Sequence, residues 1–136
     1  MSAKTPQISD AEWEVMRVVW ERRSVTAEEI VQALAGRKAW TDRTVRTFIG
    51  RLTRKGALAA RRDGRRYIYR AGVQREECVR RESKSFLSRV FDDAVTPAVV
   101  HFVEASNLSQ EQIRQLQAIL DEHARASAAR GKNHER

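Results

Sequence analysis

The sequence is poor in cysteine and proline and contains no long apolar run. Its 136 residues include one cysteine, Cys78, and two prolines. A lone cysteine cannot form an internal disulfide, so we expect the reducing cytoplasm as the protein's location. No apolar stretch approaches the roughly 18 residues that a membrane-spanning helix needs, and residues 1–6 lack the apolar core of a secretory signal. These absences exclude a disulfide scaffold and predict no membrane insertion.

Residue patterns that perform catalysis or hold metals are also missing. The three histidines, His101, His123 and His134, do not have the spacing of metal ligands, and Cys78 alone cannot complete a thiolate site. The sequence has no glycine-rich phosphate loop, nucleophile elbow or zinc-protease motif. We therefore predict no catalytic residues, no metal and no cofactor, and we do not expect an enzyme.

Positive charge is abundant and unevenly distributed. Residues 1–75 carry 17 basic and 8 acidic side chains (+9), and residues 76–136 carry 9 and 10 (−1), which together give the net charge of +8. Residues 43–70 contain ten basic side chains against only Asp63. Such one-signed charge favours a polyanionic partner, nucleic acid above all. An anionic membrane surface and a merely solubilising face are the alternatives.

Capping motifs and apolar spacing predict three helices in the first half of the chain. Residues 9–12 (Ser-Asp-Ala-Glu) and residues 26–29 (Thr-Ala-Glu-Glu) form two capping boxes. Thr41 can cap a third helix over residues 42–55, and Gly56 ends it. Its apolar stripe, at offsets 0, 3, 4 and 7, comprises Val45, Phe48, Ile49 and Leu52. The opposite face is short, cationic and rich in hydroxyl groups.

A strand pair follows the third helix. Residues 58–62 and 65–70 flank Asp63-Gly64, a dipeptide that fits a two-residue type I′ turn. This turn would place Arg62 opposite Arg65 and make the hairpin tip strongly cationic. The face expected to pack on the helices comprises Leu58, Ala60, Tyr67 and Tyr69. Like charges facing each other at the tip cost stability unless an anion neutralises them.

Three helices followed by a strand pair form the outline of a winged helix-turn-helix, in which the third helix enters the DNA major groove. We predict a mostly α fold with a small β-hairpin wing, in which a winged helix-turn-helix is followed by a helical dimerisation domain. The expected domains are a DNA-binding domain over residues 1–73, a dimerisation domain over residues 74–125 and a flexible tail over residues 126–136.

The second half carries more apolar side chains than three short helices can bury by themselves. Helices are expected over residues 74–92, after Thr96-Pro97 and after the capping box at residues 109–112. A second copy would cover their apolar stripes and would space two DNA-binding heads roughly 34 Å apart. The alternative is a helical bundle packed on the first half of the same chain. The predicted dimer interface comprises Phe86, Leu87, Val90, Phe91, Val99, Phe102, Val103, Leu116, Ile119 and Leu120.

Four segments resemble the penicillinase repressor family of BlaI, MecI and CopY-type repressors. They are residues 8–16 (Ile-Ser-Asp-Ala-Glu-Trp-Glu-Val-Met), 40–48 (Trp-Thr-Asp-Arg-Thr-Val-Arg-Thr-Phe), 63–69 (Asp-Gly-Arg-Arg-Tyr-Ile-Tyr) and 82–87 (Glu-Ser-Lys-Ser-Phe-Leu). The resemblance implies a dimeric winged-helix repressor that binds palindromes of TACA/TGTA half-sites in double-stranded DNA.

The resemblance also implies roles for individual residues. The base-reading positions of the third helix correspond to Arg43, Thr44, Arg46 and Thr47. Contacts to the DNA backbone are expected from Thr26, Thr41, Arg51, Arg54 and Arg65.

The same resemblance bears on how the repressor would be released from DNA. In β-lactam-responsive members a membrane metalloprotease sensor triggers cleavage of an Asn-Phe bond, and the corresponding pair here is His101-Phe102. Copper-responsive members carry C-terminal cysteine pairs, which residues 126–136 lack. We predict a homodimeric repressor that binds a palindromic operator and is relieved by proteolysis in the dimer domain. The alternative is a non-specific architectural DNA- or RNA-binding protein with the same basic surface.

Overall fold

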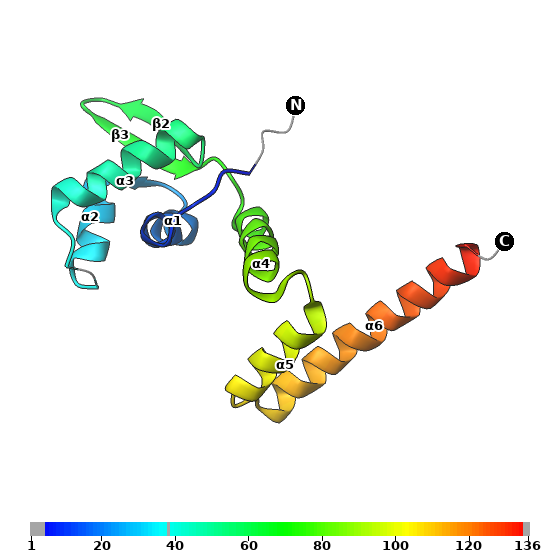
Figure 1. Cartoon of the computed structure of the whole chain (residues 1–136). Helices are drawn as coiled ribbons and strands as arrows, with labels where there is room; N and C mark the ends of the chain where they lie inside the picture. The colour runs from blue at the N-terminus through cyan, green and yellow to red at the C-terminus, as the bar shows by residue number, and fades with distance from the viewer. Residues whose placement is uncertain (1–4, 38, 135–136) are drawn as a thin grey trace. The chain divides into compact units, whose positions relative to one another are not determined.

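The computed structural model describes residues 5–37 and 39–134 and is mostly helical, with one small antiparallel sheet. The elements are α1 (Asp10–Arg22), β1 (Val25–Thr26), α2 (Ala27–Ala35), α3 (Asp42–Lys55), β2 (Leu58–Asp63), β3 (Arg66–Ala71), α4 (Arg75–Phe91), α5 (Val95–Ala105) and α6 (Gln110–His134) (Figure 1). The chain divides into two compact units, Met1–Val90 and Phe91–Arg136. The predicted fold class, a mostly α winged helix-turn-helix, is confirmed.

The first three helices begin where their capping residues predict. Ser9 Oγ accepts a hydrogen bond from Glu12 N at 3.2 Å, and Glu12 Oε1 accepts one from Ser9 N at 3.0 Å. Thr26 and Glu29 make the same reciprocal pair at the start of α2. Gly56 ends α3 with a left-handed φ of +83°, a conformation that glycine adopts without a Cβ clash. Both predicted capping boxes in this unit are therefore confirmed.

The core of the N-terminal unit lies between α1, α2, α3 and the sheet. The fully buried side chains of largest volume are Met16, Ile30, Leu34, Leu52, Val15, Val19, Val25 and Val45. In α3 three members of the predicted apolar stripe are buried and Phe48 packs partly against the core. This burial holds α3 by one face and leaves its opposite face in solvent.

The sheet has the strand order β1-β3-β2, and β1 was not predicted from the sequence. The predicted hairpin is confirmed, but its predicted register is wrong. Asp63 pairs with Arg66, so the turn is formed by Gly64 and Arg65 rather than by Asp63 and Gly64. Gly64 has a φ of +66° at the first central position, which suits a type II′ turn. This arrangement gives the positive φ to glycine and spares Asp63 the same strain.

The shifted register changes the tip of the hairpin. Arg62 faces Tyr67, and the side chains of Asp63 and Arg66 approach to 3.9 Å, so the expected Arg62–Arg65 repulsion does not arise. The packed face is also shorter than predicted. Leu58 is buried and Tyr69 packs against the core, but Tyr67 is half exposed.

Helix α4, except for its last residue Phe91, belongs to the N-terminal unit, whereas the sequence predicts a domain boundary after Val73. Cys78 lies in the same buried cluster as the core residues of the first three helices. Trp20 Nε1 donates a hydrogen bond to the Val73 main-chain oxygen at 3.0 Å. These contacts anchor the first turns of α4, and the compact unit extends to Val90.

The C-terminal unit consists mainly of α5 and α6. Helix α5 begins at Val95, so Pro97 lies within its first turn, where main-chain N–H groups have no helical partner and proline is tolerated. The predicted capping box at the start of α6 is confirmed by reciprocal bonds between Ser109 and Gln112. Helix α6 continues to His134, whereas the sequence predicts a flexible tail from Ala126. The alanines of that segment are strong helix formers and account for the difference.

Among the described helices, none has the length and apolar character to span a bilayer.

Candidate nucleic-acid interface

The solvent face of α3 carries most of the predicted base-reading and backbone-binding side chains. Those exposed on this face are Arg43, Arg46, Thr47, Arg51 and Arg54, while Thr44 is partly buried. They alternate with the buried stripe because a helix returns to the same face every three to four residues. Figure 1 shows α3 beside the β2–β3 hairpin within the N-terminal unit.

Hydrogen bonds within the first turns of α3 already engage several of these groups. The Thr41 hydroxyl accepts from Thr44 N at 3.1 Å and lies 2.9 Å from the Thr44 hydroxyl. The Thr47 hydroxyl donates to the Arg43 carbonyl at 2.9 Å. Arg46 Nε donates to the Asp42 carboxylate and forms an ion pair with it. A ligand that binds the Thr44 or Thr47 hydroxyl or Arg46 Nε must therefore share or replace an intrahelical hydrogen bond, while the terminal guanidinium nitrogens of Arg46 make no such bond within the described residues.

A groove of about 270 Å³ brings α3, the start of α2 and the hairpin together. This wing groove is lined by Thr26, Ala27, Glu28, Arg46, Arg65, Arg66, Tyr67 and Tyr69. It unites one predicted base-reading residue, Arg46, with two predicted backbone contacts, Thr26 and Arg65. The other predicted site residues do not line it.

Two residues of the wing groove, Arg66 and Tyr67, were not among the predicted DNA contacts, although Arg66 was expected in the cationic hairpin tip. The predicted register assigned Tyr67 to the packed face, and the pairing of β1 with β3 was not foreseen. That pairing places Val25 opposite Tyr69 and Thr26 opposite Ile68, which brings the start of α2 to the hairpin. The Tyr-Ile-Tyr run at residues 67–69 and the arginines before it were the available signals, and they do not reveal which edge of β3 is covered.

Thr26 is almost completely buried, and both of its hydrogen-bonding groups are engaged. Its hydroxyl accepts from Glu29 N at 3.1 Å, and its N–H donates to Glu29 Oε1 at 2.8 Å. Hydrogen bonding to the Thr26 main-chain N–H holds the pKa of the Glu29 carboxyl below its usual range. Hydrogen bonding to the Thr26 side chain adds to this effect. A phosphate at the start of α2 would therefore compete with the Glu29 carboxylate.

The predicted dimer residues of α5 and α6 are exposed in the single chain. The most exposed are Ile119 and Leu120, each at 62%, and Phe102 at 53%. A mainly apolar groove of about 400 Å³ between the two helices is lined by Val103, Ser106, Leu108, Ile113, Leu116, Gln117 and Leu120. On α4, Phe86, Leu87 and Phe91 are partly buried, and Val90 is exposed. The C-terminal unit, through the exposed side chains of α5 and α6, therefore presents a broad apolar surface.

The His101–Phe102 peptide bond lies inside α5, and both side chains are exposed. The ring centroid of Phe91 is 5.6 Å from that of His101 and 6.3 Å from that of Phe102. A protease needs an extended backbone, so cleavage at this bond requires local unfolding of α5.

Cys78 is a buried free cysteine and belongs to no metal-binding cluster among the described residues. Burial raises the pKa of the Cys78 thiol, and the Glu77 carboxylate adds to this effect. Within residues 5–37 and 39–134 no three His, Cys, Asp or Glu side chains gather closely enough to hold a metal ion.

Comparisons with known proteins agree with this architecture. Residues 8–122 match the family described as Penicillinase repressor. The penicillinase repressor of Bacillus licheniformis is 38% identical over 120 residues, covering 88% of this chain and 94% of that protein. The methicillin resistance regulatory protein MecI of Staphylococcus aureus (strain N315) is 35% identical over 121 residues, covering 89% and 98%. The solution structure of the DNA binding domain of the repressor BlaI is similar with a TM-score of 0.51 and 36% identity, covering 57% of this chain and 93% of that one. The chain belongs to the penicillinase repressor family.

Proposed function

We propose that the protein is a transcriptional repressor that binds a palindromic operator in double-stranded DNA as a homodimer. The observation that carries this proposal is the position of the exposed cationic face of α3 next to the arginines of the wing groove. An α-helix fits the major groove, and a cationic hairpin beside it can follow the phosphate backbone. The similarity to the DNA binding domain of BlaI supports the same assignment.

Uncompensated charge supports DNA as the ligand of this face. Arg43, Arg51, Arg54 and Arg65 form no ion pair within 4.0 Å among the described residues. Phosphates of a duplex would neutralise them, and the release of counterions condensed on the DNA would favour binding. A surface of this kind binds any duplex electrostatically, so specificity has to come from contacts to base edges.

We assign base reading to Arg43, Thr44, Arg46 and Thr47, which occupy the first turns of α3. An arginine can donate two hydrogen bonds to the O6 and N7 atoms of guanine, and a threonine methyl can contact a thymine methyl. The half-sites that the family resemblance implies, TACA and TGTA, contain both bases. Phosphate contacts are assigned to Thr26, Thr41, Arg51, Arg54 and Arg65, through side chains or helix N-termini.

The exposed apolar surface of the C-terminal unit supports dimerisation. Side chains such as Ile119, Leu120 and Phe102 are costly to leave in water, and a two-fold partner would bury them. Two copies would then present two α3 helices to successive major grooves, about 34 Å apart.

A competition titration tests the proposed specificity. Fluorescence anisotropy with a labelled palindrome of TACA/TGTA half-sites should show a preference of about 10³ or more over random duplex at physiological salt. Equal affinity for both duplexes, or for RNA, would support the non-specific architectural alternative. Absence of salt-sensitive binding would exclude a nucleic-acid function altogether.

Sedimentation velocity tests the proposed dimer. The wild-type chain is expected to sediment as a dimer at micromolar concentration, and Ile119→Asp is expected to shift it towards the monomer, because a buried charge opposes association. Gln115→Asp, a change at an exposed polar position of the same helix, is the matched control. A wild-type chain that stays monomeric would refute the dimer.

We assign release of the operator to cleavage at the His101–Phe102 bond, with a membrane metalloprotease sensor acting on the pathway. Separation of the dimer domain would leave single DNA-binding heads that lose the affinity gained from two linked half-sites. Mass spectrometry of the protein from induced cells should detect a fragment that ends at His101. An intact chain under induction would refute this route.

A further inference from the structure

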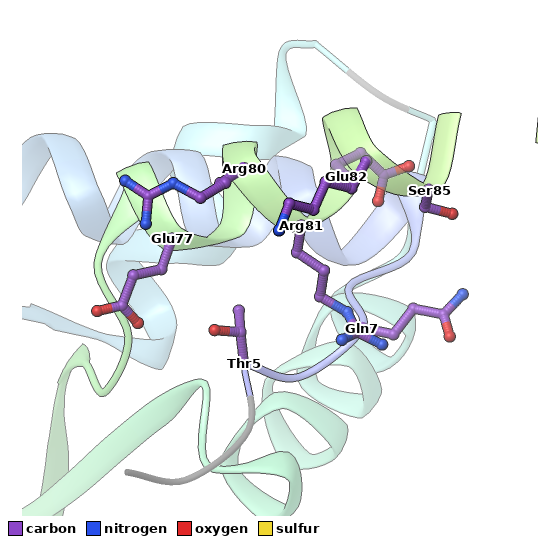
Figure 2. A pocket seen from close by; sticks show the side chains of 8 residues that line it. Thr5, Gln7, Glu77, Arg80, Arg81, Glu82 and Ser85 are labelled. Carbon is purple, nitrogen blue, oxygen red and sulfur yellow. The ribbon is translucent and has the colours of Figure 1, made fainter. Parts of the chain in front are cut away.

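An open cavity of about 670 Å³ lies within the N-terminal unit between residues 5–7 and α4. It is lined by Thr5, Gln7, Glu77, Arg80, Arg81, Glu82, Lys84 and Ser85, and we refer to it as the α4 cavity (Figure 2). It shares no lining residue with the wing groove. Its volume is in the range of sites that hold small molecules. The proposed DNA contacts therefore leave this cavity without a role.

The α4 cavity has an excess of uncompensated positive charge. Arg80, Arg81 and Lys84 form no ion pair within 4.0 Å in the described part of the chain. Of the two lining carboxylates, Glu82 lies 3.8 Å from Arg89, a cation outside the cavity lining. Three cations are thus opposed mainly by Glu77.

Arg81 has a potential ion-pair partner on its own helix. Glu77 precedes Arg81 by four residues, the spacing that favours an intrahelical ion pair. The two side chains nevertheless form no such pair, and Figure 2 shows Arg81 extending from α4 toward Gln7. Arg81 therefore presents its guanidinium group to the cavity instead of neutralising Glu77.

We propose that the α4 cavity binds a compact multivalent anion carrying phosphate or carboxylate groups, and that binding is coupled to α3. Guanidinium groups donate paired hydrogen bonds that match both kinds of anion. The Thr5 and Ser85 hydroxyls and the Gln7 amide supply further donors around the same space. A hollow lined on several sides suits a small ligand better than the convex surface of a duplex.

The coupling route runs from Gln7 to the last residue of α3. Lys55 Nζ donates to the main-chain oxygen of Gln7 at 2.9 Å and to Glu12 Oε1 at 2.5 Å. An anion held against Gln7 would therefore be linked through one hydrogen bond to Lys55, the last residue of α3. This part of the inference rests on the proposed function of α3 in DNA binding, whereas anion binding itself does not.

Isothermal titration calorimetry at constant ionic strength tests the binding site. Pyrophosphate and citrate are the probes, and they distinguish a preference for phosphate from one for carboxylate. Saturable binding of either is expected, with a loss of about tenfold or more in the Arg80→Gln/Arg81→Gln variant. Arg75→Gln, at an exposed arginine of α4 outside the cavity, should leave the affinity unchanged. No saturable binding at millimolar concentration, or an equal loss in Arg75→Gln, would overturn the site.

Operator titrations with and without saturating probe test the coupling. The affinity for DNA is expected to change about fivefold or more, and by linkage the DNA should change the anion affinity by the same factor. The Glu12→Gln/Lys55→Met variant should still bind the probe but lose this effect, and thermal unfolding verifies that it is folded. A change of less than twofold in the wild type would refute coupling.

Operator binding and the anion site are tested by separate measurements. Failure of the operator preference in these titrations leaves the calorimetric result intact, so the proposed function and the anion site are tested separately. If Arg80→Gln/Arg81→Gln weakens duplex binding while neither probe binds, these arginines contact DNA and the anion site is wrong.

Discussion

Lys55 Nζ lies 2.5 Å from Oε1 of Glu12, although the two residues are 43 positions apart in the sequence. Glu12 is 2% exposed and belongs to the capping box of α1, while Lys55 ends α3. The second carboxylate oxygen, Oε2, is buried and accepts no hydrogen bond among the described residues. Lys55 therefore supplies the principal compensation for a charge buried between two helices.

Replacement of Lys55 by methionine is expected to destabilise the N-terminal unit. The change leaves the buried Glu12 carboxylate without its cation, which costs on the order of 3 kcal/mol in the free energy of unfolding. Urea denaturation of the two proteins measures this difference. The double variant Glu12→Gln/Lys55→Met should recover part of the loss, because glutamine is neutral and can still complete a capping box. Equal stability of Lys55→Met and the wild type would show that the pair contributes little.

The stability of the unit should fall at acidic pH in a way that depends on Glu12. Burial raises the pKa of this carboxyl, but hydrogen bonds from Lys55 and Ser9 and the charge of Lys55 outweigh it and hold the pKa below its usual range. The unfolded chain therefore binds the proton more tightly than the folded one. The stabilisation is complete above the usual carboxyl pKa and is lost as the pH falls through the lower value of the folded state.

Urea denaturation from pH 6 to pH 3 of the wild type and Glu12→Gln isolates this contribution, because the other carboxylates titrate in both proteins. The wild type is expected to lose stability more steeply than the variant. Parallel pH profiles would contradict a lowered Glu12 pKa.

Arg46→Ala and Arg65→Ala are expected to affect DNA binding differently. Loss of Arg46 should cost about 1–3 kcal/mol in the free energy of binding to the operator and relax the sequence preference at one base pair. Loss of Arg65 should weaken binding to the operator and to random duplex alike. Anisotropy titrations against both duplexes at two salt concentrations measure the difference, and Arg65→Ala should also reduce the salt dependence. If the two variants lose equal affinity on both duplexes, the assigned division between base and phosphate contacts is wrong.

Gly50 within α3 and Gly56 at its C-terminal cap should respond in opposite directions to replacement by alanine. Gly56 has a φ of +83°, where an L side chain is strained, so Gly56→Ala should lower the free energy of unfolding by about 1–2 kcal/mol. Gly50 lies inside the helix with open space around it, so Gly50→Ala should raise it by about 0.5–1 kcal/mol. Thermal or urea unfolding measures both, and a stabilising Gly56→Ala would contradict the assigned conformation.

Local sequence chemistry predicts much of this molecule. The capping pairs Ser9–Glu12 and Thr26–Glu29 form as expected because both partners lie within one helical turn. The cationic face of α3 could likewise be predicted, since it follows from helical spacing alone. Dimerisation and the base contacts remain predictions, because both depend on molecules outside the single chain.

Contacts between distant segments could not be read from the sequence. The hairpin register depended on whether Asp63 takes a positive φ together with Gly64 or leaves it to Gly64 alone, and the wing groove depended on β1 pairing with β3. The Glu12–Lys55 pair and the α4 cavity likewise join segments more than 40 residues apart, such as Gln7 and Lys55. Helix caps and amphipathic faces arise from neighbours within a turn, and the sequence determines them directly. Which side chains meet across helices and strands depends on how the whole core packs, and only the tertiary structure decides it.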